Sequence, residues 1–202
     1  MKKSMLLVAT CLFMTCGLFA QNSATEINAE IQTDIEKFIN ECSYTKTEYV
    51  EDFRTKSCYI DALVLTDLET NQKIGGVHIQ ARDIASAILS MGAVPEKNAD
   101  LGYLDVSELD DVLKVLYDII QTSNQEHPLK YVISYTSKSG IQIRFYSDDE
   151  EVFIGRTYEA TNDFGVKFTY TLTTNDISLK EAGRLIKKLT SAKEKINKVI
   201  NQ

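Results

Sequence analysis

The sequence has few of the residues from which most catalytic and metal centres are built. Tryptophan is absent, and the 202 residues include only two histidines, two prolines and nine glycines. Neither His78 nor His127 has a second ligand at zinc-site spacing, and we expect His78 to be an ordinary side chain on a strand face. The glycine patterns of phosphate-binding loops and of the hydrolase nucleophile elbow are also missing. These absences predict a non-catalytic chain without metal or cofactor, with a hydrolase that uses two carboxylates as the alternative.

Long apolar runs are missing as well, except at the N-terminus. Two lysines precede an apolar stretch over residues 5–19, and the small residue Ala20 follows it. This order is typical of a bacterial secretory signal peptide, and the stretch is shorter than the roughly 20 residues of a membrane-spanning helix. We predict that residues 1–20 are cleaved and that the rest is exported to the periplasm or secreted, without a membrane span.

The alternative is a lipoprotein, because Cys11 and Cys16 lie within the same apolar stretch. The cleavage box of a lipoprotein resembles leucine, two small residues and the modified cysteine. Cys16 follows the bulky Phe13 and Met14, which do not fit this pattern. We therefore favour cleavage without lipid attachment.

Positive charge is scarce, since 22 lysines and arginines stand against 29 aspartates and glutamates, for a formal net charge of −7. This balance gives no electrostatic basis for binding nucleic acid or an anionic membrane. Residues 21–202 are enough for one hydrophobic core and hardly enough for two. We expect a single α+β domain, with 21–104 and 105–202 as candidate halves.

Beyond residue 20 the chain has only two cysteines, Cys42 and Cys58. Disulfides persist outside the cytoplasm, and a bridge between these two would close a loop of about 15 residues and contribute roughly 3 kcal/mol. The alternative is two separately buried thiols, and the sequence does not decide between them.

Apolar spacing predicts an α+β fold in which an antiparallel sheet of two meanders packs against amphipathic helices. The first half is predicted to contain a helix over 21–43, begun by a capping box of Ser23 and Glu26, and strands over 44–53, 58–67 and 73–81. A helix over 82–92, a linking stretch to Tyr103 and a helix with Ser107 as its N-cap follow.

The second half repeats this pattern, with strands predicted over 129–137, 141–147, 152–158 and 166–173. A closing helix begins at Ser178, which is spaced to form a capping box with Glu181. Both closing helices start with an aspartate, a β-branched residue and a serine, at 105–107 and 176–178. This likeness suggests an internal duplication as an alternative to two unrelated halves.

Two local features share residue types with ligand loops. Gly75-Gly76 is the only glycine pair, and we expect it to mark a strand bulge or a close backbone approach. The acidic run over 148–151 has the carboxylates that calcium prefers, but it lacks the alternating ligands and the glycine of a calcium loop. We interpret it as the solvated tip of a hairpin.

This hairpin offers a candidate binding surface. With a three-residue turn at 148–150, Phe145 would face Phe153 on the core side of the sheet. Tyrosine and arginine are the residues that most often anchor protein interfaces, and they occur on the opposite face. The candidate binding residues on that face are Gln142, Arg144, Tyr146, Ile154, Arg156 and Tyr158. The alternative is a face that is merely solvated or covered by a helix.

The segment Tyr135–Gly140 (YTSKSG), with the strands and capped helix after it, resembles a group of small secreted bacterial proteins of unknown function. The resemblance covers residues 103–195. It implies export and an α+β fold, and it supplies no activity and no catalytic residue. The succession of meanders closed by helices is also similar to small extracytoplasmic inhibitors and binding modules, which favours binding over catalysis.

We therefore predict a non-catalytic interaction protein that binds another protein through the exposed sheet face. The alternative function is a small-ligand carrier with an apolar pocket between sheet and helices. In that pocket Tyr103, Tyr131 and Tyr135 would be walls with polar tips.

Overall fold

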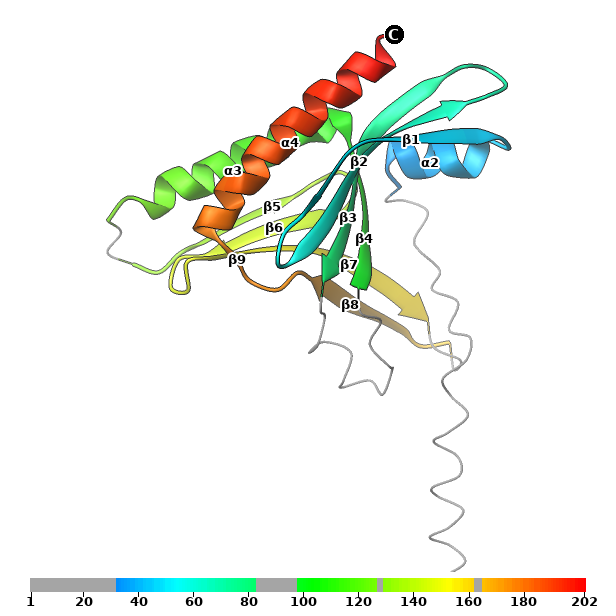
Figure 1. The fold of residues 1–202 in the computed structure, drawn as a ribbon. Coiled ribbons are helices and arrows are strands. Elements are labelled where there is room, and N and C mark those ends of the chain that lie inside the picture. The colour runs from blue at the N-terminus through cyan, green and yellow to red at the C-terminus, as the bar shows by residue number, and fades with distance from the viewer. Residues whose placement is uncertain (1–31, 83–97, 127–128, 162–164) are drawn as a thin grey trace, which may run out of the picture.

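The computed structural model describes residues 32–82, 98–126, 129–161 and 165–202 and shows an α+β fold with two antiparallel sheets (Figure 1). The first sheet has the order β1-β2-β3-β4, with β1 (Thr45–Arg54), β2 (Cys58–Asp67), β3 (Lys73–Arg82) and β4 (Asn98–Asp105). The second has the order β5-β6-β7-β8, with β5 (Val132–Thr136), β6 (Ile141–Tyr146), β7 (Glu151–Thr161) and β8 (Lys167–Thr173); β9 (Ile177–Ser178) pairs with β7. The helices are α2 (Asp34–Glu41), α3 (Leu109–Ser123), which follows the short 3-10 helix η2 (Val106–Glu108), and α4 (Leu179–Ile200). Each predicted meander thus forms a sheet of its own.

A fourth strand occupies the stretch before Tyr103 that the sequence predicts as a link, so that prediction is wrong. β4 pairs with β3, and the register shifts between Ile79 and Gln80. Leu101 and Leu104 are both buried, although they are an odd number of residues apart. The irregularity therefore breaks the two-residue periodicity by which a strand is recognised. Most of the helix predicted over 82–92 lies outside the described residues.

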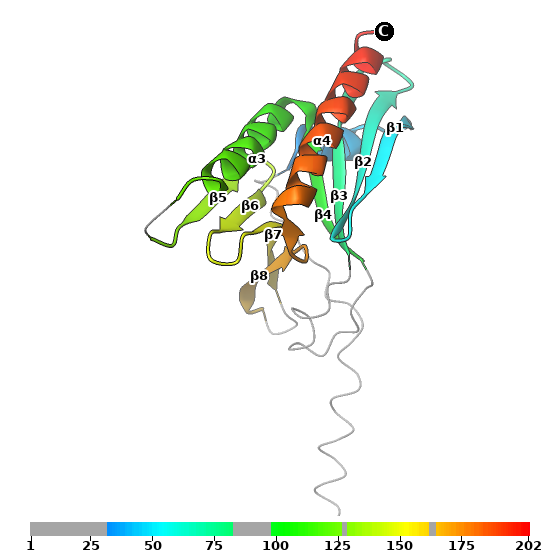
Figure 2. The ribbon, with the colours of Figure 1, turned by 60° about the vertical axis from the view of Figure 1, so that its left-hand side comes forward.

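The two long helices lie side by side on one side of the sheets (Figures 1 and 2). α4 packs against β1, β2 and β3, and α3 packs against β5. The hydroxyl of Ser178 accepts the backbone N–H of Glu181 at 3.3 Å, as predicted for the start of α4. The N-cap prediction for Ser107 is wrong, because Asp105 and Glu108 form the capping box. Since Asp105 begins one helical segment and Ser178 the other, the two starts are not equivalent, and an internal duplication is not confirmed.

The short helix α2 covers the face of the first sheet that α4 leaves open. It begins at Asp34, with Thr33 and Glu36 as its capping box. Residues 32–33 are not helical, so the prediction of one continuous helix over 21–43 is wrong. The predicted signal peptide and the predicted cap at Ser23 lie outside the described residues. Among the described helices, none is long and apolar enough to cross a membrane.

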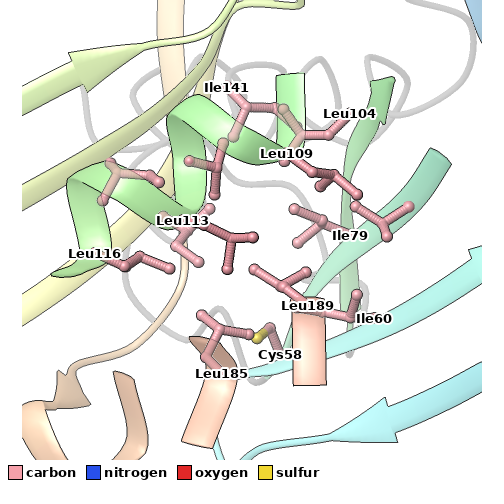
Figure 3. Packing of buried hydrophobic residues seen from close by; sticks show 14 of the residues in the cluster. Cys58, Ile60, Ile79, Leu104, Leu109, Leu113, Leu116, Ile141, Leu185 and Leu189 are labelled. Carbon is pink, nitrogen blue, oxygen red and sulfur yellow. The ribbon is translucent and has the colours of Figure 1, made fainter. Parts of the chain in front are cut away.

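One hydrophobic core joins residues from both sheets and both long helices. Figure 3 shows part of it, with Ile60, Ile79, Leu113, Leu116, Ile141, Leu185 and Leu189 among the labelled side chains. A smaller cluster on the other face of the first sheet contains Ile35 of α2 with Leu63 and Leu65 of β2. Alternate residues of β2 therefore serve two cores, which explains why this strand reads as a continuous apolar run.

Gly75 and Gly76 lie where β3 is crowded on both faces. A Cβ on Gly75 would lie 2.5 Å from Cγ2 of Ile196 in α4. A Cβ on Gly76 would lie 2.5 Å from Cδ1 of Ile35 and would overlap the carbonyl oxygen of Leu104. The predicted close backbone approach is confirmed, because a side chain at either position would force its neighbours to shift.

Cys42 and Cys58 are both free thiols. Cys58 begins β2, whereas Cys42 lies near Asp67 at the opposite end of that strand, roughly 30 Å away at the rise of an extended chain. A disulfide requires Cα atoms within about 7 Å. The structure therefore has two separate thiols and not a bridge.

Candidate functional site

A groove of about 700 Å³ lies between the β1–β2 turn, the end of β3 and the N-terminal half of α4. Its lining residues are Phe53, Arg54, Thr55, Lys56, Arg82, Ser178, Lys180, Glu181, Arg184, Leu185, Lys187 and Lys188. Seven of these are lysine or arginine and only Glu181 is acidic, in a chain whose formal net charge is −7. The volume is within the range of ligand sites, about 300–1,000 Å³. Positive charge is therefore concentrated at one hollow of an acidic protein.

The helix wall of the groove is a basic stripe along α4. Its members, Lys180, Arg184, Lys187 and Lys188, follow one another at helical spacing and so share one face of the helix. Leu185 at the base of this wall is 1% exposed and belongs to the core. The apolar stripe of α4 is thus committed to packing, which leaves the basic stripe beside the groove. Ser178 adds the helix N-terminus, where the helix dipole gives further positive potential.

The opposite wall is the tight turn between β1 and β2. The hydroxyl of Thr55 accepts the backbone N–H of Ser57 at 3.1 Å. Nη1 of Arg82 donates to the carbonyl oxygen of Thr55 at 2.9 Å. The guanidinium carbons of Arg82 and Arg54 lie 4.7 and 5.1 Å from the ring centre of Tyr59. The aromatic face attracts both cations and holds them at this end of the sheet.

Two hydrogen bonds join the walls of the groove. The backbone N–H of Lys56 donates to Oε1 of Glu181 at 2.9 Å, so the one acidic lining residue is engaged with the backbone. The hydroxyl of Ser57 donates to the carbonyl oxygen of Asp176 at 3.0 Å. The β1–β2 turn is therefore fixed to the start of α4, and the groove is preformed.

One lining lysine has a carboxylate partner outside the groove. Nζ of Lys188 lies 3.4 Å from Oε1 of Glu51, and Nζ of Lys195 lies 3.2 Å from Oε2. Burial raises the pKa of Glu51, but hydrogen bonds from Ser191 and from the two lysines outweigh burial and hold this pKa below its ordinary value. Within the described parts of the chain, no other lining residue forms an ion pair. The groove keeps a large excess of positive charge.

The acidic run over 148–151 lies next to this groove. In both ribbon views the lower end of α4 stands between the β1–β2 turn and the β6–β7 turn (Figures 1 and 2). A hollow of about 460 Å³ beside the acidic turn is lined by Asp149, Glu150, Glu151, Asp176, Ser178, Leu179 and Lys180. It shares Ser178 and Lys180 with the basic groove. Patches of opposite charge therefore flank the first residues of α4.

The acidic run is a hairpin tip, as predicted. Residues 147–150 form the turn between β6 and β7, and 148–150 are exposed. Nζ of Lys130 lies 3.0 Å from Oδ2 of Asp148. No group of three side chains that could hold a metal ion occurs within the described residues.

The six predicted binding residues do not share one face of the second sheet. The turn has four residues and not three, so Phe145 pairs with Val152 instead of Phe153. A register shift of one residue moves every side chain of β7 to the opposite face. Ile154 and Arg156 are therefore buried, at 3% and 4% exposure, and the prediction that they are exposed is wrong. The predicted residues that stay on the outer face of β6 are Gln142, Arg144 and Tyr146.

Phe153 joins these three residues on the outer face. The rings of Tyr146 and Phe153 meet edge-on with centroids 5.6 Å apart. Nη2 of Arg144 donates to Oε1 of Gln142 at 2.6 Å, and Nε2 of Gln142 donates to the Thr157 hydroxyl at 3.3 Å. The outer face is thus a hydrogen-bonded polar surface with one aromatic pair at its end.

Arg156 and Tyr158 connect the second sheet to β4 and α2. Nη1 of Arg156 lies 2.9 Å from Oε1 of Glu36 and donates to the carbonyl oxygen of Leu101 at 3.4 Å. The hydroxyl of Tyr158 donates to the carbonyl oxygen of Asp100 at 2.7 Å. Both side chains have structural partners, which separates them from the outer face.

His78 is a strand-face side chain, as predicted, and His127 lies outside the described residues. Nε2 of His78 lies 2.8 Å from Oδ1 of Asp100, and its ring stacks on Tyr103 with centroids 4.6 Å apart. Tyr103 packs against the small cluster beneath α2, whereas Tyr131 and Tyr135 pack against the main core. The three tyrosines therefore do not form the walls of one pocket.

Sequence reasoning missed the basic groove because its residues come from 53–56, 82 and 178–188. The net negative charge of the whole chain also concealed a local excess of the opposite sign. One signal was present in the sequence: the polar face of the last helix carries four basic residues at helical spacing. The prediction for this helix rested only on the apolar stripe of its opposite face.

Comparisons with protein-family models, with curated proteins and with solved structures found no match to this chain. A functional proposal therefore has to be based on the geometry and charge of the site itself.

Proposed function

We propose that this chain is an exported, non-catalytic interaction protein that binds a negatively charged partner in the basic groove. The proposal keeps the class of function that the sequence predicts and moves the principal binding surface from the sheet face to the groove. The observation that carries it is the gathering of seven basic side chains around one preformed hollow of an acidic chain.

An anionic partner would relieve the mutual repulsion of these side chains. The stacking of Arg54 and Arg82 on Tyr59 holds two of the cations in place, and the packing of α4 fixes the helix that carries four others. Because the two arginines and the helix backbone are already positioned, less conformational entropy is lost on binding. Each exposed ion pair contributes only about 0.2–1 kcal/mol, so appreciable affinity requires several pairs that form together.

The spacing of the charges favours an extended partner over one small anion. Lys180 and Lys188 are about 12 Å apart along the helix axis at 1.5 Å per residue. Arg54 and Lys56 line the opposite wall. A single phosphate or sulfate ion does not reach all of these groups. A polypeptide segment with several carboxylates contacts both walls at once, which makes an acidic protein partner the best match.

A fluorescent oligo-glutamate peptide is a suitable probe, with binding followed by anisotropy at about 0.1 M and about 1 M salt. The parent chain is expected to bind the probe and to lose affinity at the higher salt concentration. The double variant Arg184→Glu with Lys187→Glu is expected to bind at least about tenfold more weakly, a difference of about 1.4 kcal/mol.

The matched control is Lys167→Glu with Lys198→Glu, which changes the net charge equally at two exposed positions outside the groove. This control is expected to bind like the parent. If the two double variants lose affinity equally, the probe responds to overall charge and the groove is not a binding site.

The outer face of β6 and β7 is a second candidate site, favoured by the Tyr146–Phe153 pair beside Arg144. For this face we propose a protein partner, since aromatic and arginine side chains anchor many protein interfaces. Arg144→Ala with Tyr146→Ala is expected to abolish capture of a specific protein from envelope extract, while the groove variant still captures it. Equal capture by all three chains would rule this face out.

A further inference from the structure

We propose that the basic groove binds the acidic β6–β7 hairpin tip of a second copy of this chain, and that two copies exchange these contacts around a two-fold axis. The inference rests on the proposed function and names the partner at the same groove. It is carried by the position of two oppositely charged patches on either side of the start of α4.

The hairpin tip has the form that an inserting element needs. Asp149 and Glu150 are exposed at the end of two paired strands, which are about 4.8 Å apart and so make a narrow projection. Glu150 adopts a left-handed backbone conformation with φ of 54°, which closes the four-residue turn. The tip therefore presents consecutive carboxylates on a defined scaffold instead of a random chain end.

The acidic side chains at the tip outnumber the basic side chains that lie near them in the same chain. Lys130 is paired with Asp148, at the base of the turn. On the other side, burial and then the carboxylates of Asp176 and Asp149 raise the pKa of Glu151 above its ordinary value. Lys180 is the one basic residue that lines the hollow beside these acids. Crowded carboxylates on the tip and crowded cations in the groove are each relieved when the two patches of different copies meet.

Two-fold symmetry follows from the proximity of the two patches. Ser178 and Lys180 border both hollows. The β1–β2 turn and the β6–β7 turn lie at the same end of the molecule (Figures 1 and 2). A second copy rotated about an axis near this point places its tip against the first groove and its groove against the first tip. Such an isologous contact closes on itself, and two-fold dimers are the commonest symmetric assemblies.

The net charge of −7 on each copy opposes association. Salt screens this long-range repulsion beyond about 8–10 Å near physiological ionic strength, whereas ion pairs inside the contact are screened less. The dimer is therefore expected to be strongest at intermediate salt concentration and to dissociate at about 1 M salt.

A charge swap tests the pairing by sedimentation equilibrium of the purified chain. The tip variant Asp149→Lys with Glu150→Lys and the groove variant Arg184→Glu with Lys187→Glu are each expected to stay monomeric, because each change places side chains of the same sign opposite one another at both contacts. A mixture of the two variants restores opposite charges at both contacts and is expected to form a heterodimer. The control Lys167→Glu with Lys198→Glu is expected to dimerise like the parent.

Circular dichroism and the melting temperature confirm that each variant is folded before its molar mass is measured by sedimentation equilibrium. A monomeric parent at every concentration and salt, or a mixture that stays monomeric while the parent dimerises, would overturn this inference. If the parent is monomeric yet binds oligo-glutamate at the groove, the partner is not a second copy of this chain and the proposed function stands. If neither the peptide nor a second copy binds, the proposed function fails as well.

Discussion

Oδ1 of Asp105 accepts the backbone N–H of Ile35 at 3.0 Å, across 70 positions of the sequence, and Oδ2 accepts that of Asp34 at 2.8 Å. One carboxylate thus satisfies two of the N–H groups that the start of α2 leaves without helical partners. Glu108 accepts the backbone N–H groups of Asp105 and Ser139, each at 3.2 Å. These two acids join α2, β4, α3 and the β5–β6 turn at one buried point.

Replacing Asp105 with alanine is expected to lower the free energy of unfolding by about 2–4 kcal/mol, because two charge-assisted hydrogen bonds are lost and two N–H groups are left unsatisfied. Urea denaturation measures the change. Asp34→Ala is the control, since its side chain is 68% exposed and its backbone N–H is unaltered; its effect is expected within about 0.5 kcal/mol. An equal effect of both substitutions would show that Asp105 does not anchor α2.

The Asp105 carboxylate also predicts a dependence of stability on pH. Burial raises its pKa above the ordinary value of 3.8, in spite of the two N–H groups that it accepts. The folded chain therefore binds this proton more tightly than the unfolded chain does. The contribution of Asp105 to the free energy of unfolding is largest below pH 3.8 and declines as the pH rises through the raised pKa.

Asp105→Asn removes this titration, so the stability difference between parent and variant is expected to shrink or reverse from pH 3 to pH 7. Urea denaturation at several pH values measures that difference. A difference that grows steadily in favour of the parent as the pH rises would mean that the folded pKa is lowered and that the physical account is wrong.

The ion pair between Arg156 and Glu36 is expected to behave as a buried unit. Arg156 is 4% exposed, and its Nη1 lies 2.9 Å from Oε1 of Glu36. Arg156→Ala is expected to cost about 3–5 kcal/mol, because it leaves a shielded carboxylate without its partner. Arg156→Met combined with Glu36→Gln is expected to cost less than Arg156→Met alone. Additive losses in this double-mutant cycle would show that the two side chains are not coupled.

Most strands and the start of α4 are predictable from the sequence because their signals are local. A continuous apolar run indicates β2, alternating apolar residues indicate β3, and Ser178 lies three positions before Glu181. The register of β6 and β7 is different, since it depends on whether the turn contains three or four residues. That choice is decided by the left-handed conformation of Glu150 and by the burial of Ile154, neither of which the pattern shows.

The burial of Arg156 and the basic groove are beyond sequence reasoning for a related reason. Arginine on a strand is ordinarily placed in solvent, and partners that are distant in the sequence, Glu36 among them, make its burial favourable. In the groove, Arg54, Arg82 and Arg184 belong to three separate elements. Their meeting is a result of tertiary packing, so the basic face of the last helix indicates one wall of the groove and not the combined site.

The two thiols are expected to differ in reactivity. Burial raises the pKa of Cys58 to about 11, so very little thiolate is present near neutral pH. Burial and the carboxylates of Asp67, Glu41 and Glu69 also raise the pKa of Cys42, but this side chain is only partly covered. Iodoacetamide applied to the folded chain is expected to modify Cys42 slowly and Cys58 only after unfolding. Peptide mapping by mass spectrometry locates the label, and early modification of Cys58 would contradict the burial described for β2.

Two glycine-to-alanine substitutions are expected to change stability in opposite directions. A Cβ on Gly76 would overlap the Leu104 carbonyl oxygen, and that atom cannot move without disturbing the β3–β4 pairing. Gly76→Ala is therefore expected to destabilise the fold by about 1–3 kcal/mol.

Gly183 lies inside α4, and a Cβ there would have its nearest neighbour, Cδ1 of Ile120, at an ordinary contact distance of 3.8 Å. Gly183→Ala is expected to stabilise the chain by about 0.5–1 kcal/mol, because alanine restricts the unfolded chain and favours the helix. Thermal and urea unfolding of both variants test the pair. A neutral Gly76→Ala would mean that β3 and β4 are less closely packed than the structure shows, and a destabilising Gly183→Ala would mean that α3 and α4 approach each other more closely.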